Sequence, residues 1–228
     1  MITLAGNILK RFQNEGAIKT LRLMKARSRA LVCALLEDRR RGISTALIVK
    51  EQEPEIADVR CHYYAATDYE TFHLAMQQVV VRAGEDVFVD FGSGKGRIVM
   101  LAAELPFRQV IGVEFSRQLH LAGLKNLAVA QPQLRCADVQ LLHADATQWK
   151  VPGDATVLFF FNPFDGEVLA KVCENIRRSI AESPRRVTLI YVRPEKFFEK
   201  EIAWQEWLTK KAELACLEGK VAIYETRP

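Results

Sequence analysis

An acid and a run of glycines follow a short apolar stretch in the sequence VFVDFGSGKGR, which begins at Val87. The residues of this stretch that could contact a ligand are Asp90, Gly92, Ser93, Gly94 and Gly96. Glycine adopts positive φ without strain and lacks the Cβ that would keep a ligand away from the backbone. Helix N-termini also offer unpaired N–H groups to anions. The stretch therefore predicts a turn that binds a ligand through its main chain.

Three ligand classes make different demands on this turn. A phosphate-binding P-loop requires Gly-x-x-x-x-Gly-Lys-Ser/Thr, but Gly96 follows Lys95 and Val89 stands where the first glycine is needed. The dinucleotide fingerprint Gly-x-Gly-x-x-Gly/Ala requires a third small residue, where this chain has Arg97, so it fits only in part. An acid two residues before Gly-x-Gly-x-Gly is the third pattern. It fits from Asp90 onward without a gap.

The turn DFGSGKGR resembles the first motif of the class I methyltransferases that use S-adenosylmethionine. The resemblance extends over roughly residues 62–192, because the residues that follow the next three predicted strands match the further motifs of this family in the same order. It implies that Asp90 and the glycine turn hold the methionine end of the cofactor. A turn-capping role for this acid is the alternative.

Acids also close the next two predicted strands. Glu114 ends the second strand, 22 residues after Gly92, where a carboxylate can accept both ribose hydroxyls. Asp145, followed by Ala146, closes the third strand, and the resemblance implies that it binds the adenine amino group. Capping of a local turn is the alternative for Asp145.

Asn162, Pro163 and Phe164 follow the fourth predicted strand. An asparagine oxygen and a backbone carbonyl of the turn can accept both hydrogens of an NH2 group, which directs the nitrogen lone pair. The aromatic ring can stack on the target. The triplet resembles a shortened form of the Asn/Asp-Pro-Pro-Tyr/Phe signature of nitrogen methyltransferases, without its second proline. An ordinary strand-ending turn is the alternative.

Two residues upstream of the glycine turn are further candidates for cofactor contact. Tyr64 resembles an aromatic that some families place against the methionine end. Thr67 opens a Thr-x-x-Glu capping box that ends at Glu70, so we expect it first as a helix cap and second as a ligand group. Together with the turn and the Asn-Pro-Phe triplet, this region is similar to seven-strand lysine methyltransferases without a SET domain. That similarity favours a protein amine as the substrate.

These candidates require strands and helices that alternate along the chain. The predicted strands lie near residues 86–91, 109–114, 138–142, 155–161, 186–192 and 219–225. The predicted helices lie near residues 17–37, 67–81, 96–105, 116–130, 166–182 and 195–210. Several strands are continuous apolar runs, as expected where helices cover both faces of a sheet. We expect a doubly wound, mostly parallel α/β fold, and the resemblance implies seven strands.

The amino-terminal segment differs from the rest in charge. Residues 1–50 contain eleven Lys or Arg and three acids, a net charge of +8, within a total of +4. The remainder therefore carries −4. We expect a basic helical extension over residues 1–60 and a methyltransferase domain over residues 61–228. The extension predicts an acidic partner, which could be a protein, a nucleic acid or anionic lipid.

Other classes of site are not indicated. The five cysteines and four histidines show no metal-binding spacing, so no metal is expected. No apolar run approaches the ~20 residues of a membrane helix and no signal peptide is visible, which predicts a cytoplasmic protein. The expected function is methyl transfer from S-adenosylmethionine to a protein side-chain nitrogen. A nucleic-acid methyltransferase and a non-catalytic binding module are the two alternatives.

Overall fold

The computed structural model describes residues 17–46, 66–162, 166–194, 207–217 and 219–227. The strands are β1 (Val87–Phe91), β2 (Gln109–Glu114), β3 (Asp138–His143), β4 (Ala155–Phe161), β5 (Thr188–Val192), β6 (Leu208–Cys216) and β7 (Gly219–Thr226). The helices are α2 (Ala17–Arg41), α3 (Tyr69–Met76), α4 (Arg97–Ala103), α5 (Arg117–Ala130), the 3-10 turn η1 (Gln131–Gln133) and α6 (Gly166–Glu182).

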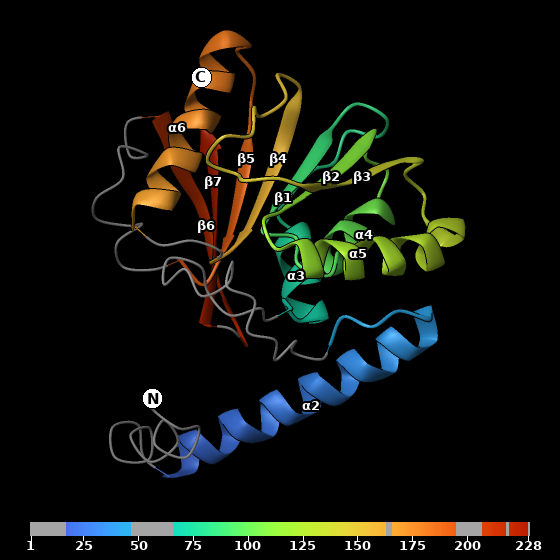
Figure 1. Ribbon diagram of the computed structural model, residues 1–228. Helices are drawn as coiled ribbons and strands as arrows, with labels where there is room; N and C mark the ends of the chain where they lie inside the picture. The colour runs from blue at the N-terminus through green and yellow to red at the C-terminus, as the bar shows by residue number, and fades with distance from the viewer. Residues whose placement is uncertain (1–16, 47–65, 163–165, 195–206, 218, 228) are drawn as a thin grey trace.

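Within the described residues the strands form one seven-stranded sheet in the order β3-β2-β1-β4-β5-β7-β6. Strands β1 to β5 pair in parallel, whereas β7 is antiparallel to both β5 and β6. Helices α3, α4 and α5 lie on one face and α6 lies on the other (Figure 1). The predicted doubly wound, mostly parallel sheet is confirmed. Its direction of winding switches between β1 and β4, the usual ligand-binding position in such sheets.

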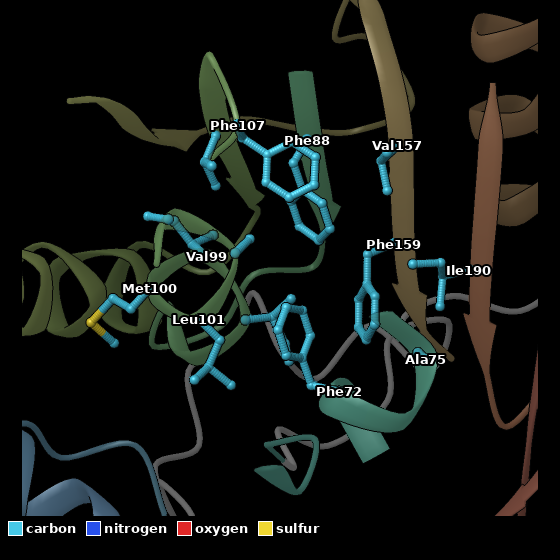
Figure 2. Close-up of a cluster of buried hydrophobic side chains, with 14 of the residues drawn as sticks. Phe72, Ala75, Phe88, Val99, Met100, Leu101, Phe107, Val157, Phe159 and Ile190 are labelled. Carbon is cyan, nitrogen blue, oxygen red and sulfur yellow. The ribbon is translucent and has the colours of Figure 1, made fainter. Parts of the chain in front are cut away.

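The apolar strands supply side chains to a hydrophobic core on each face. On the side of α3, Phe159 lies 6.2 Å from both Phe72 and Phe88, measured between ring centroids (Figure 2). On the side of α6, Phe91 stacks on Phe160 at 4.7 Å, and Phe160 stacks on Tyr191 at 5.6 Å. Burial on both faces explains why these strands read as unbroken apolar runs.

A glycine in the middle of β2 allows α4 and the glycine turn to approach the sheet closely. A Cβ at Gly112 would lie 2.6 Å from Val99 of α4, 2.7 Å from Leu141 and 2.8 Å from the Cβ of Ser93. Such contacts are shorter than packed carbon atoms tolerate. Gly112 therefore helps to place the turn over the end of the sheet.

The structure corrects the predicted helix near residues 195–210 at its end. Residues 195–206 lie outside the described residues, but Leu208 to Lys210 belong to strand β6. This edge strand is charged and largely exposed, so its apolar alternation is weak in the sequence. Pairing with β7 determines its conformation.

The predicted capping box at Thr67 is also wrong. Asp68 caps α3, because its side chain accepts a hydrogen bond of 2.9 Å from the backbone N–H of Thr71. The helix ends at Met76, earlier than the predicted Val81. Aspartate is as good a cap as threonine, and two adjacent capping residues made the register ambiguous.

Helix α2 confirms the predicted amino-terminal helix and continues to Arg41 (Figure 1). Its final turns contact the sheet-bearing part of the chain through an ion pair between Arg41 and Glu104. The predicted boundary near residue 60 stays a prediction, since residues 47–65 lie outside the described residues. No helix in the described part of the chain is long and apolar enough to cross a membrane.

Candidate cofactor and methyl-transfer site

The glycine turn lies at the carboxyl end of β1, next to the switch point of the sheet. Gly92, Gly94 and Gly96 have φ angles of 80°, 53° and 82°. Other residues are strained in this left-handed region, which explains the three glycines. The N–H groups of Gly92 and Ser93 both donate to the carbonyl of Val113, at 2.9 and 3.0 Å. The turn is therefore fastened to the end of β2.

The structure brings Glu114 onto this turn. One carboxylate oxygen accepts a 2.7 Å hydrogen bond from the N–H of Gly94, and the other accepts one of 2.8 Å from Ser116. Burial raises the pKa of Glu114, and the N–H groups of Ser116 and Gly94 oppose that rise. The backbone N–H of Phe115 also hydrogen bonds to this carboxylate, so about one of its roughly four acceptor positions stays open to a ligand hydroxyl.

Asp90 is a second buried carboxylate beside Glu114. Its residue is only 3% exposed, and burial, followed by the charge of Glu114, raises the pKa of Asp90 well above its ordinary value. Nearby, the hydroxyl of Ser93 is buried and has no hydrogen-bond partner among the described residues. Two adjacent buried carboxylates and an unsatisfied hydroxyl favour a ligand that brings positive charge and hydrogen-bonding groups.

Asp145 follows β3 and serves a local turn. Its carboxylate accepts hydrogen bonds from the N–H and hydroxyl of Thr147, at 2.8 and 2.7 Å, and from the Gln148 amide at 3.1 Å. Burial alone would raise the pKa of Asp145, but these bonds lower it. Ala146 follows and is buried; its carbonyl accepts a 3.2 Å hydrogen bond from Asn175 of α6. The geometry thus shows the turn-capping role and leaves the adenine contact a prediction.

Asn162 emerges beside the glycine turn, as expected from the pairing of β1 with β4. Phe91 is level with Phe160 in that pairing, so the residues after both strands meet at the same edge. Asn162 is buried, adopts a φ of 38°, and its side-chain oxygen lies 3.5 Å from the donor hydroxyl of Tyr191. Asparagine tolerates this left-handed conformation better than most residues. Pro163, Phe164 and Tyr64 lie outside the described residues.

Arg97, which ends the glycine-rich stretch, is a buried connector that the sequence did not reveal. Its guanidinium donates to the Thr45 hydroxyl at 2.7 Å, to the Thr67 carbonyl at 3.0 Å and to the Asp38 carboxylate at 3.4 Å. It also lies over the ring of Tyr69, 4.7 Å from the centroid. Thr67 thus contributes its backbone carbonyl to the support of the turn.

Asp38 is the acceptor at the centre of this cluster. It accepts hydrogen bonds from the Tyr69 hydroxyl at 2.8 Å, the Thr45 hydroxyl at 2.8 Å and the N–H of Ala46 at 2.7 Å. Burial and this bond to Asp38 raise the pKa of Tyr69 to about 12, although Arg97 opposes the rise. One indication of this cluster was present in the sequence, which is that Arg97 stands where the dinucleotide fingerprint requires a small residue.

A second link joins the amino-terminal segment to the turn. The Asn126 side chain of α5 accepts from the N–H of Ser44 at 2.9 Å and donates to the carbonyl of Lys95 at 3.0 Å. Ser44 and Asn126, which are far apart in the sequence, therefore both support the glycine turn.

Comparison with known proteins places this geometry in a fold family. No protein-family model and no curated protein matches the chain. Among solved structures, the precorrin-6y C5,15-methyltransferase of Geobacter metallireducens is 16% identical, with a TM-score of 0.52 over 71% of this chain and 88% of that one. The chain has the fold of the class I methyltransferases.

Two further structures share the fold. The precorrin 8W decarboxylase of Methanobacterium thermoautotrophicum is 20% identical, with a TM-score of 0.51 over 72% of this chain and 93% of that one. A mutant of MtNAS in complex with S-adenosylmethionine is 14% identical, with a TM-score of 0.53 over 70% of this chain and 61% of that one. Identities this low establish the fold, and the chemistry has to be argued from the site.

Proposed function

We propose that the chain is an S-adenosylmethionine-dependent methyltransferase that acts on a nitrogen, with an amine of a protein side chain as its substrate. The observation that carries the proposal is the meeting of Asp90, Glu114 and three positive-φ glycines at the switch point of the sheet. S-adenosylmethionine has a cationic methionine end and two ribose hydroxyls, which match the buried carboxylates and the open backbone of the turn.

In this proposal different residues around the turn bind different parts of the cofactor. Asp90 and the glycine turn bind the methionine end, while Glu114 accepts hydrogen bonds from the ribose. Asp145 and Ala146 bind the adenine, and Tyr64 contacts the methionine end. When bound, the cofactor supplies a methyl group on a positively charged sulfur. Thr67 supports the turn through Arg97 and is the least direct of the predicted contacts.

Asn162 is proposed to orient the accepting amine. Its position next to the turn allows the side-chain oxygen to accept a hydrogen from the incoming nitrogen, so that the lone pair points toward the turn. Much of the rate of such a displacement can come from holding this geometry. Pro163 and Phe164 would stiffen the loop and stack on the target. A lysine amine must be neutral to react, and solvent can take its proton.

Cofactor binding is tested first, by isothermal titration of the full chain with S-adenosylmethionine and with S-adenosylhomocysteine. We expect saturable heat with both. A chain that binds neither compound would be a binding module that retains only the fold. Gly94→Val is the matched variant, because a β-branched side chain at a φ of 53° is strained and would obstruct the turn.

The substrate class is tested by transfer of a radiolabelled methyl group from S-adenosylmethionine to a fractionated lysate. Label in protein, stable to nuclease and sensitive to protease, supports the proposal. Label in nucleic acid would instead assign a nucleic-acid methyltransferase, for which the basic amino-terminal segment is the supporting feature. Label only in small molecules would refute both macromolecular substrates.

A further inference from the structure

Helix α2 exposes a row of large apolar side chains, here called the apolar stripe. It consists of Ile18, Leu21, Met24, Leu31, Val32, Leu35 and Leu36, which are 40–69% exposed. Leu21, Met24, Leu31 and Leu35 follow at intervals of three, seven and four residues, so they lie along one side of the helix. Single exposed leucines are ordinary, whereas two groups of exposed apolar residues on the same side of one helix, Ile18 to Met24 and Leu31 to Leu36, mark an interaction surface.

Basic residues flank the apolar stripe. The exposed Lys or Arg residues of α2 are Arg22, Lys25, Arg27, Arg29, Arg39 and Arg40. Lys25 lies one turn from Leu21 and Arg29 lies one turn from Val32, so charge borders the stripe along its length. The helix contains no acid before Glu37, which pairs with Arg40, and its other acid, Asp38, is buried.

This combination discriminates between possible partners. A second copy of α2 would bring the same uncompensated positive charges together, which opposes self-association. A nucleic acid would neutralise the basic residues but would leave the apolar stripe in water. A bilayer with anionic lipids accommodates both, because apolar side chains enter the acyl boundary while Lys and Arg contact the headgroups. We propose that α2 lies on the surface of an anionic membrane.

The attachment of α2 to the domain is compatible with this orientation. The carboxyl-terminal turns of the helix are fixed by buried Ala34 and Asp38 and by the ion pair of Arg41 with Glu104, and the apolar stripe beside this attachment stays exposed. The helix extends along the side of the molecule away from α6 (Figure 1). The rest of the chain carries −4, so an anionic surface repels it while attracting the amino-terminal segment. This inference holds whether or not the chain transfers methyl groups.

The test is co-sedimentation of the full chain with vesicles of phosphatidylcholine alone or mixed with phosphatidylglycerol. We expect binding to the mixed vesicles that weakens as salt increases, because counter-ions screen the basic residues. Neutral vesicles should bind much more weakly, since a short apolar face alone gives marginal affinity.

Two variants separate the contributions of the stripe and of the charges. Leu21→Gln/Leu31→Gln/Leu35→Gln should abolish vesicle binding. Lys25→Gln/Arg29→Gln should weaken it about 30-fold, since each basic residue near an anionic surface contributes roughly fivefold. The matched control is Arg177→Gln/Arg178→Gln on α6, which removes the same charge from an exposed helix elsewhere and should bind as the unchanged chain does.

Three results would overturn the inference. One is failure of the unchanged chain to bind the mixed vesicles. The second is full binding by the leucine variant, provided that its circular dichroism and its urea unfolding match those of the unchanged chain. The third is a stripe-dependent dimer in analytical ultracentrifugation, or stripe-dependent RNA binding, without any affinity for vesicles. The dimer would assign the apolar stripe to a second copy of the chain, and the RNA binding would assign it to a nucleic acid.

Discussion

The residues with the most unusual environment are the two buried carboxylates beside the glycine turn. Asp90 and Glu114 are both buried, and the pKa of each is raised above its ordinary value, mainly by burial. A buried carboxyl group with a raised pKa destabilises the folded chain once it ionises. A positively charged ligand that binds next to these carboxylates offsets the free-energy cost of ionising them. The buried carboxylates therefore favour a cationic ligand such as the proposed cofactor.

Asp90→Asn is expected to weaken cofactor binding about 10- to 100-fold, the typical effect of losing a charge-assisted hydrogen bond. The same change should stabilise the ligand-free chain at neutral pH. Between the ordinary pKa of an aspartic acid and the raised pKa of Asp90, the folded chain keeps a proton that the unfolded chain has released. The contribution of Asp90 to the free energy of unfolding is therefore largest at acid pH. It is lost as the pH rises from the ordinary pKa of aspartic acid through the raised pKa of Asp90.

Denaturant unfolding of both chains across this pH range, without cofactor, measures the effect. The free energy of unfolding of the unchanged chain should fall relative to that of Asp90→Asn as the pH increases. If the variant is instead the less stable one at neutral pH, the Asp90 carboxylate stabilises the apo fold and is not poised for a cation.

Asn162→Ala separates binding from transfer. Since the turn and the carboxylates bind the cofactor, the dissociation constant for S-adenosylhomocysteine should change less than about threefold, whereas transfer slows about 100-fold as the amine loses its orientation. Titration calorimetry and single-turnover labelling of the accepting fraction give the two numbers. Loss of cofactor affinity equal to that of Gly94→Val would show that Asn162 belongs to the cofactor site.

At the scale of elements, the glycine turn depends on a helix and a segment far from it in sequence. Asp38 of α2 and Arg97 of α4 are 59 residues apart, yet both are almost fully buried and joined through one hydrogen-bonded cluster. Buried charges are tolerated only when they are paired and hydrogen bonded. The end of α2 is thus part of the support of the site.

Asp38→Ala is expected to lower the free energy of unfolding by about 3–5 kcal/mol, because the Arg97 charge remains buried after its carboxylate partner is removed. Glu37→Ala is the neighbouring control. Glu37 forms an exposed ion pair with Arg40 and a longer one of 3.4 Å with Arg41, so its loss should cost about 1 kcal/mol. Urea unfolding measures both, and equal effects would mean that the cluster around Asp38 contributes no more than a surface pair.

At the scale of the whole molecule, charge and apolar burial are unevenly distributed. The described strands and their helices bury two apolar cores, whereas α2 exposes apolar and basic side chains together. The segment that carries the positive charge is attached to the glycine turn through Asp38 and Asn126. A partner that binds α2 is therefore held at one side of the proposed site.

S-adenosylhomocysteine at about 100 times its dissociation constant should stabilise the chain by about 2.7 kcal/mol, because it binds only the folded state. For a protein of this size that corresponds to an increase in melting temperature of about 5–10 °C. Differential scanning fluorimetry measures the shift. Gly94→Val should show none, and a shift of equal size in that variant would place the ligand away from the turn.

The sequence alone determined the segments that form β1 to β5 and β7 and the polar residues that follow β1 to β4. Continuous apolar runs predict buried parallel strands, and glycines after Asp90 predict a turn with positive φ, because both properties depend on neighbouring residues. The place of Asn162 beside the turn follows from the pairing of β1 with β4, which the resemblance to a known fold implied and local sequence did not.

Only the tertiary structure decided which partners the polar residues have. Contacts of Arg97 with Asp38 and of Asn126 with Ser44 join distant segments, and no periodicity along the chain encodes them. The edge strand β6 depends on pairing with β7, and the cap of α3 was decided between two equally suited neighbours, Thr67 and Asp68. Local sequence limits backbone conformation, whereas the pairing of buried charges depends on how the chain folds back on itself.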